Sequence, residues 1–188
     1  MINERRAPRA LDYPVAPASL PDIELDAGRY RLRFARSHED LDAILRLRFT
    51  VFNLELGEGL DLAYVTQRDE DDFDARFHHL MIEHRESGDV VGTYRMQTAA
   101  MAREQGGFYS ADEFDLSGIP ADVLARSVEL GRACVAKEHR NGRVLNLLWR
   151  GLASYLIWNQ LTCLFGCCSL TSQDPRLGRA VLARLEGE

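Results

Sequence analysis

One stretch, residues 127–151, constrains the fold more than any other part of the chain. It reads SVELGRACVAKEHRNGRVLNLLWRG and changes from strand-like to helix-like periodicity near Arg143. The strand half places Glu129 and Arg132 in an otherwise apolar run, where unpaired charges would be costly to bury. The two side chains are therefore expected to face a cleft or each other. Gly131 between them suits a bulge or a close approach of the backbone.

The helix half of this stretch begins after a basic turn, HRNGR, at residues 139–143. The free N–H groups of a helix N-terminus, together with nearby Arg and Lys side chains, can hold an anion. A strand that carries a carboxylate, followed by such a turn, suits group transfer from a phosphate-bearing donor.

Composition limits the class of protein. With 188 residues and 46% apolar content, the chain is long enough for one domain with a sizeable core. Its net charge of -6 argues against nucleic acid as the main partner. It lacks an apolar run long enough for a signal peptide or a membrane span, so any membrane contact is expected to be peripheral. Its cysteines lack zinc-site spacing, which indicates reduced, cytoplasmic thiols and no metal site: Cys134, Cys163, Cys167 and Cys168.

The remaining periodicity predicts an α/β layout with a mixed sheet. Residues 1–27 are rich in proline and charge and are expected to form an extended or disordered arm, and residues 28–188 a single domain. The expected elements are a strand at 28–36, a helix at 38–53 capped by Ser37, a hairpin of strands at 79–84 and 89–98, the central strand, a helix at 143–160, a buried strand at 161–170 and a final helix at 174–185.

Other charged residues are candidates for a site. Arg48 and Phe52 lie four apart and share a helical face, although an Arg extended over a core Phe explains the pair equally well. The acidic run RDEDDFDARF, which contains Asp74, is typical of a solvated loop or of a flexible lid over a substrate. Arg95 near the end of a strand is, taken alone, more typical of a surface or ion-paired residue.

Taken together, five phrases resemble the GNAT N-acyltransferases, and among them the L-ornithine N-acyltransferases of ornithine lipid synthesis and the related autoinducer synthases. They are RLRFTVFNLELG, GTYR, GGFYS, VELGRACV and NLLWRG. The resemblance implies a GNAT-like acyl-CoA N-acyltransferase fold, with a mixed central sheet flanked by helices. It also implies transfer of a (3-hydroxy)fatty acyl group to the α-amine of L-ornithine, which gives lyso-ornithine lipid.

The resemblance assigns roles to the acceptor side of the site. Arg48 and Phe52 would line the acceptor and acyl pocket. Glu129 would accept the ammonium proton, directly or through water, and Arg132 or Arg95 would hold the carboxylate of the acceptor. A backbone N–H in a bulge at 131–134 would stabilise the oxyanion. Asp74, or another residue of the acidic run, would meet the side-chain ammonium of ornithine.

On the donor side, Val135 and Arg140 match the acyl-donor motif of the family. The glycines that follow in CoA-binding members are replaced by Arg143 and Leu145. The resemblance therefore favours acyl carrier protein as partner, with its acyl-phosphopantetheine as donor and no tightly bound cofactor. Val135, Arg140 and Arg143 would contact this donor, in the cytoplasm or at the inner face of the membrane.

Two departures from the family leave alternatives open. His78 replaces an Asp of the relatives, and relatives generally continue beyond residue 175, which implies a C-terminally shortened form. The chain could instead be an autoinducer synthase or an N-acyl amino acid synthase, or a non-catalytic module that binds acyl carrier or lipid. In the simplest structural reading, Glu129 and Arg132 form a buried ion pair that fixes the strand.

Overall fold

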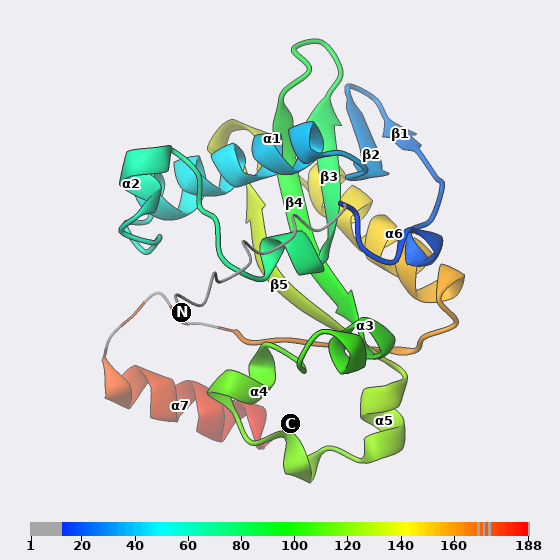
Figure 1. Ribbon diagram of the computed structural model, residues 1–188. Helices are drawn as coiled ribbons and strands as arrows, with labels where there is room; N and C mark the ends of the chain where they lie inside the picture. Colours follow the sequence, from blue (N-terminus) through cyan, green and yellow to red (C-terminus); the bar gives the residue numbers. More distant parts are fainter. Residues whose placement is uncertain (1–12, 169, 171, 173, 188) are drawn as a thin grey trace, which may run out of the picture.

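A mixed sheet forms the centre of the computed structural model, which describes residues 13–168, 170, 172 and 174–187 (Figure 1). Within these residues the strand order is β1-β2-β3-β4-β5-β6. Neighbours from β1 to β5 are antiparallel and β5 with β6 is parallel, which confirms the predicted mixed sheet. The strands are β1 (Leu25–Ala27), β2 (Tyr30–Phe34), β3 (His78–His84), β4 (Val90–Thr98), β5 (Ser127–Val135) and β6 (Cys163–Phe165).

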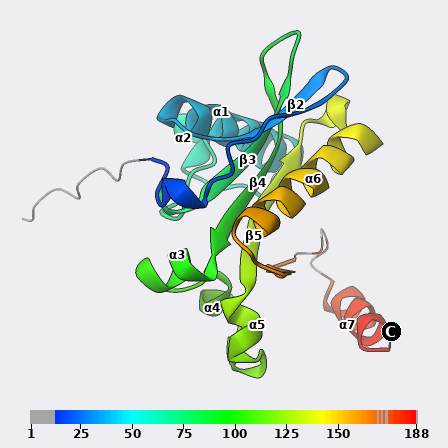
Figure 2. The ribbon, with the colours of Figure 1, turned by 90° about the vertical axis from the view of Figure 1, so that its right-hand side faces the viewer.

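Helices cover both faces of the sheet, with α1 on one face and α6 on the other (Figures 1 and 2). The α-helices are α1 (His38–Arg48), α2 (Ala63–Thr66), α3 (Ala99–Glu104), α4 (Ser110–Glu113), α5 (Ala121–Ala125), α6 (Gly142–Trp158) and α7 (Pro175–Leu185). A π-helical segment, η2 (Phe49–Glu55), extends α1, and the 3-10 turns are η1 (Pro17–Ser19), η3 (Asp74–Arg76), η4 (Leu116–Gly118) and η5 (Lys137–His139). No helix among the described residues is both long and apolar enough to cross a bilayer.

Side-chain caps define where the two main helices begin. Ser37 accepts a hydrogen bond from the N–H of Asp40 at 3.2 Å, as its position before the helix predicted. Asn141 accepts from the N–H groups of Arg143 and Val144 at 3.0 and 3.2 Å. These caps satisfy N–H groups that the first helical turn leaves without a partner in the helix.

The helix α6 packs very closely on the sheet. Its buried side chains join the main core with residues of β2, β3, β4 and β5. A β-carbon at Gly151 would overlap the side chains of Leu32 and Leu80, so only glycine allows this approach. The buried residues of α6 are Val144, Leu147, Leu148, Gly151, Leu152 and Tyr155.

A β-bulge interrupts the pairing of β4 with β5, as Gly131 in the strand pattern indicated. Arg95 pairs with Gly131 and Thr93 with Cys134, so two residues of β5 lie opposite Tyr94 alone. Arg132 in this bulge has a φ of 49°. Backbone in this left-handed region is uncommon for a residue with a side chain, and it redirects the Arg132 side chain away from the regular strand.

Two predicted elements have different bounds. The helix expected at 38–53 is α-helical only to Arg48, where the hydrogen bonding changes to the π-type spacing of η2. The buried strand expected at 161–170 is wrong: β6 has three half-buried residues and lies at the sheet edge, pairing with β5 only at 127–129. Apolar residues continue beyond β6, but the paired region is short. It covers residues 127–129 of β5, and the bulge of β5 at 132–133 follows shortly after it.

The predicted N-terminal arm differs from what its described part shows. Residues 1–12 lie outside the described residues. Tyr13 and Leu20 are buried, and β1 pairs with β2, so the segment after residue 12 packs on the domain. The side chain of Trp158 donates to the carbonyl of Ala18 at 2.9 Å and holds this segment near the end of α6.

Gly151→Ala is expected to destabilise the protein by about 1–3 kcal/mol, because the added methyl overpacks the contact with Leu32 and Leu80. Urea denaturation followed by circular dichroism measures the change. Gly142→Ala is the matched control, because a β-carbon there meets no atom within 4 Å. Equal stability of the two variants would contradict the close approach of α6.

Candidate active site

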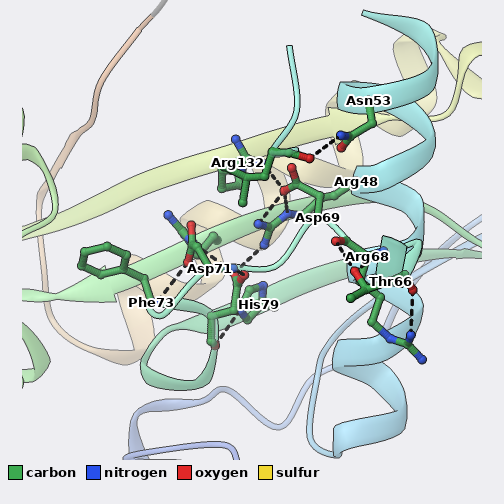
Figure 3. A network of polar contacts seen from close by, with 12 residues as sticks. Arg48, Asn53, Thr66, Arg68, Asp69, Asp71, Phe73, His79 and Arg132 are labelled. Atoms are coloured by element: carbon green, nitrogen blue, oxygen red, sulfur yellow. Dashed lines mark hydrogen bonds and ion pairs between the residues drawn. The ribbon is translucent and has the colours of Figure 1, made fainter. Parts of the chain in front are cut away.

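A buried network of ion pairs lies between α1 and the sheet (Figure 3). Arg48, at the end of α1, donates from Nε and Nη2 to Oδ1 of Asp69 at 2.9 and 2.8 Å. Its Nη1 donates to Oδ1 of Asp74 at 2.5 Å. All three side chains are at most 1% exposed. A guanidinium with carboxylates on both sides is the arrangement that allows an arginine to be buried.

Two further arginines reach this network from neighbouring strands. Arg95 of β4 donates to both oxygens of Asp71 at 2.6 and 2.7 Å and to Oδ1 of Asp74 at 3.0 Å. Arg132, at the bulge of β5, donates to Oδ1 of Asp69. The sheet and the 69–74 segment are thus joined by alternating positive and negative groups.

Part of the acidic segment therefore belongs to the interior, whereas Glu70 and Asp72 are exposed, which corrects the expectation of a wholly solvated loop. Asp69 and Asp74 are buried, and three aspartates balance three arginines. Burial would raise the pKa of Asp74, but the charge of Arg48, with smaller effects of His79 and Arg95, lowers it to about 2. Burial lowers the pKa of His79 to about 3, so its ring is neutral at pH 7.

Arg132 connects the network to an apolar cavity. Its guanidinium lies 4.3 Å from the centre of the Phe52 ring, a cation–π contact. Phe52 in turn lines a cavity of about 690 Å³ between η2, the bulged part of β5 and the start of α6. Its other lining residues are mostly apolar, and they include Val51, Leu56, Tyr94, Val135, Val144, Leu145 and Leu148. A polar cluster and an apolar cavity therefore meet at Arg132 and Phe52.

Glu129 also lies on β5, but it does not form the buried ion pair with Arg132 that the simplest structural reading of the sequence expected. Its carboxylate accepts from the backbone N–H of Tyr109 at 3.0 Å and of Ser110 at 2.6 Å. Arg132 pairs with Asp69 instead, because the bulge turns it toward α1. Gln97, opposite Glu129 on β4, donates to the carbonyl of Gly107 at 2.9 Å. The two side chains together fix the GGFYS loop on the sheet.

The predicted donor residues are only partly brought together. Val135 and Arg140 line the 690 Å³ cavity, whereas Arg143 lines a separate cavity of about 450 Å³ with Arg29 and Tyr30. Arg140 forms a bidentate ion pair with Glu55, in which Nη1 and Nη2 donate to Oε1 and Oε2 at 2.6 and 2.7 Å. Because Asn141 already caps two N–H groups of α6, the helix start is less open to an anion than the basic turn suggested.

His78 stands where the resemblance led us to expect an Asp, and its ring makes two hydrogen bonds. Its ring bonds to the hydroxyl of Tyr155 and to the carbonyl of Val15, both at 2.7 Å. Burial lowers its pKa to about 4. His78 therefore ties the N-terminal segment to the sheet and does not enter the Arg48 network.

Several site residues were not singled out by the sequence. Asp69 and Asp71 belonged to the acidic run, but no periodicity marked them as buried. Glu55 and Tyr109 lie within the phrases RLRFTVFNLELG and GGFYS, but the sequence did not indicate their contacts, because their partners lie 85 and 20 residues away. Three buried polar atoms of the arginine and aspartate side chains in the network have no hydrogen-bond partner among the described residues, namely Oδ2 of Asp69, Nε of Arg95 and Nε of Arg132.

The family profile of the Acetyltransferase (GNAT) domain matches residues 47–150, more than half of the chain. The chain therefore belongs to the GNAT acetyltransferase family. Its fold agrees: the AHL synthase LasI aligns over 73% of this chain and 71% of its own, with a TM-score of 0.52. At 17% identity, that likeness concerns the fold alone.

Within this family, the chain is similar to curated L-ornithine N(alpha)-acyltransferases, which confirms the resemblance seen in its motifs. It is 36% identical to that of Brucella abortus (strain 2308) over 158 residues, 79% of this chain and 55% of that protein. It is 34% identical to that of Agrobacterium fabrum (strain C58) over 165 residues, 84% of this chain and 56% of that protein. The chain spans about half the length of the curated relatives it matches.

Asp74→Asn is expected to lower the free energy of unfolding by about 3–5 kcal/mol at pH 7, because it leaves the buried Arg48 with one carboxylate fewer. Urea denaturation measures the loss. Asp42→Asn is the control, since its exposed pairs with Arg46 and Arg68 contribute at most about 1 kcal/mol. Similar losses in the two variants would contradict a buried network.

The same carboxylate predicts a pH dependence. Because the folded-state pKa of Asp74 is lowered from 3.8 to about 2, its ionisation stabilises the fold above pH 4, and this stabilisation is lost as pH falls toward 2. The stability difference between the wild type and Asp74→Asn should therefore shrink over this range. Parallel urea titrations at several pH values test it, and a constant difference would contradict the assignment.

Proposed function

We propose that this chain transfers a (3-hydroxy)fatty acyl group from acyl carrier protein to the α-amine of L-ornithine, giving lyso-ornithine lipid. The observation that carries the proposal is the position of Arg132, which contacts the carboxylate of Asp69 and the ring of Phe52 at the wall of the apolar cavity. An enzyme that joins a charged amino acid to a fatty chain needs both environments side by side. The similarity to L-ornithine N(alpha)-acyltransferases supplies the choice of substrates.

The network suits the acceptor because it offers partners of both signs. The guanidinium N–H groups of Arg95 and Arg132 would receive a carboxylate, and the buried Oδ2 of Asp69, which lacks a hydrogen-bond partner, would receive an ammonium. Buried polar atoms without partners cost roughly 1–3 kcal/mol each, so a bound amino acid that supplies partners gains affinity. Asp74 fixes Arg48 and Arg95 and acts on the acceptor through them.

The cavity suits the donor. Its walls of Val, Leu, Phe and Tyr would shield the acyl chain from water, and Val135 and Arg140 lie where the β5 bulge passes into the turn before α6. Arg140 would contact the phosphopantetheine arm after releasing Glu55, and Arg143 would contact the carrier protein outside the cavity. No tightly bound cofactor is needed for this reaction.

The reaction itself needs three events. Attack of the neutral α-amine on the thioester carbonyl forms the C–N bond, the nitrogen of the resulting tetrahedral intermediate loses a proton, and the C–S bond breaks as the carrier sulfur takes up a proton and leaves as a thiol. A backbone N–H of the 131–134 bulge would stabilise the oxyanion. The ammonium proton would pass through water to Glu129, which also holds the GGFYS loop in place through Tyr109 and Ser110.

The direct test is mass spectrometry of the products formed from 3-hydroxyacyl carrier protein and a pool of amino acids that includes ornithine. N-acyl ornithine is the expected product. A different acylated amine would show that the acceptor is not ornithine, as expected for an autoinducer synthase or an N-acyl amino acid synthase. Absence of product beside an active full-length relative would favour a non-catalytic module that binds acyl carrier or lipid.

Glu129→Gln is expected to lower kcat by about 10²–10⁴-fold if the carboxylate receives the proton. Because the amide would also face the N–H groups of Tyr109 and Ser110, the pH profile of kcat/KM decides between the two roles. If Glu129 is the base, the fall of kcat/KM at low pH should be present in the wild type and absent in the variant. A profile of unchanged shape with a lower plateau would assign Glu129 to positioning of the loop alone.

Arg132→Lys is expected to lower kcat/KM for ornithine by at least about tenfold, because an ammonium cannot contact Asp69, Phe52 and a carboxylate with the same geometry. Steady-state kinetics with saturating donor measure the effect. Arg126→Lys is the control, because Arg126 forms an exposed ion pair with Asp122, four residues earlier in the chain. Equal kinetics for both variants would contradict the role of Arg132.

A further inference from the structure

The outward face of α6 is apolar over most of its length. Leu145, Trp149 and Ile157 are 56%, 53% and 77% exposed, and Ala153 between them is exposed as well. Their spacing of four residues places them in a row that winds slowly around the helix. Exposed apolar rows of this kind, which include a tryptophan, are typical of a contact surface.

The charges on this face have one sign. Arg143 and Arg150 lie seven residues apart, so they follow one margin of the helix, and residues 142–158 contain no Asp or Glu. This absence contrasts with the net charge of -6 for the whole chain. A helix with an apolar face and an arginine margin is typical of binding at an anionic surface.

The last helix repeats the pattern. Leu177, Leu182 and Leu185 of α7 are 47%, 56% and 66% exposed. Residues 175–185 contain arginines 176, 179 and 184 and no Asp or Glu. Figure 2 shows α7 and α6 on the same side of the sheet, opposite α1 and α2. Two helices of the same chemistry therefore project from one side of the molecule.

The donor cavity and this side share one residue at the start of α6. Leu145 belongs to the cavity wall and also to the exposed row of α6. From this we infer that the exposed faces of α6 and α7 bind the surface of an anionic phospholipid bilayer and bring the cavity to it. Exposed Trp, Ile and Leu side chains enter the interface between headgroups and acyl chains, while Arg150 and the arginines of α7 contact lipid phosphates.

An acidic carrier protein would also be attracted to arginines, but the extent of the apolar row favours the bilayer. Trp149 and Ile157 are about two helical turns apart, and α7 adds a second apolar helix on the same side of the sheet. A surface of this extent suits a broad, flat partner. The inference rests on the proposed function in one respect: an N-acylated amino acid with a fatty chain is a product that would pass from the cavity into lipid. The binding itself can be measured without turnover.

The test is co-sedimentation of the full chain with vesicles of equimolar phosphatidylcholine and phosphatidylglycerol. The double variant Trp149→Ser with Ile157→Ser should lower the vesicle partition coefficient by at least about tenfold. The control is Leu62→Ser with Val65→Ser, which removes apolar residues that are 70% and 80% exposed on the α1 side. It should bind as the wild type does. Raised salt should weaken wild-type binding, because the arginine contribution is screened.

Equal binding of the two double variants, or no wild-type binding to these vesicles, would overturn the inference. So would a loss of binding to acyl carrier protein in Trp149→Ser with Ile157→Ser while vesicle binding is kept, since the surface would then be the carrier dock. Acyl transfer in vesicle-free solution is measured in parallel. Absence of that activity in the wild type would count against the proposed function and leave the vesicle result intact.

Discussion

The fold depends on the ion pairs that Arg48 makes with Asp69 and Asp74 in the interior. Each charge alone would be too costly to bury, and the arrangement is stable only when α1, β4, β5 and the 69–74 segment are in place together. The network therefore adds charged contacts to the apolar packing of α1 against the sheet. It also creates a polar interior next to an apolar cavity, which is the pairing of environments that an amide-forming enzyme for fatty chains requires.

The bulge in β5 sets the geometry of the boundary between these environments. Without the extra residue opposite Tyr94, alternation along the strand would direct the Arg132 side chain differently. With it, Arg132 reaches both Asp69 and the Phe52 ring. The same irregularity opens the pairing of β4 and β5 at the cavity wall. One local departure from strand geometry thus serves both halves of the site.

Much of this organisation could be predicted from the sequence. The order of elements along the chain and the mixed sheet followed from the strand and helix patterns, the bulge from Gly131 and the helix start from Ser37, because these signals are local. Partner choice could not be predicted, since it depends on how distant segments cross. Asp69 and Asp74 looked solvated because charge runs usually are. Glu129 and Arg132 looked like a pair because both are charged residues in an otherwise apolar run, where unpaired charges are costly to bury. The β6 strand was overestimated because apolar content alone does not fix pairing length.

The π-helical segment η2 has a consequence for the binding of substrate. Its backbone bonds span five residues, as from the N–H of Leu56 to the carbonyl of Val51, and such spacing is less stable than a regular helix. Phe52 sits in this segment and forms part of the cavity wall. A long acyl chain in this cavity would therefore lie against the part of the helix whose hydrogen bonding departs from the regular α-helix, and would meet the Phe52 ring that Arg132 contacts.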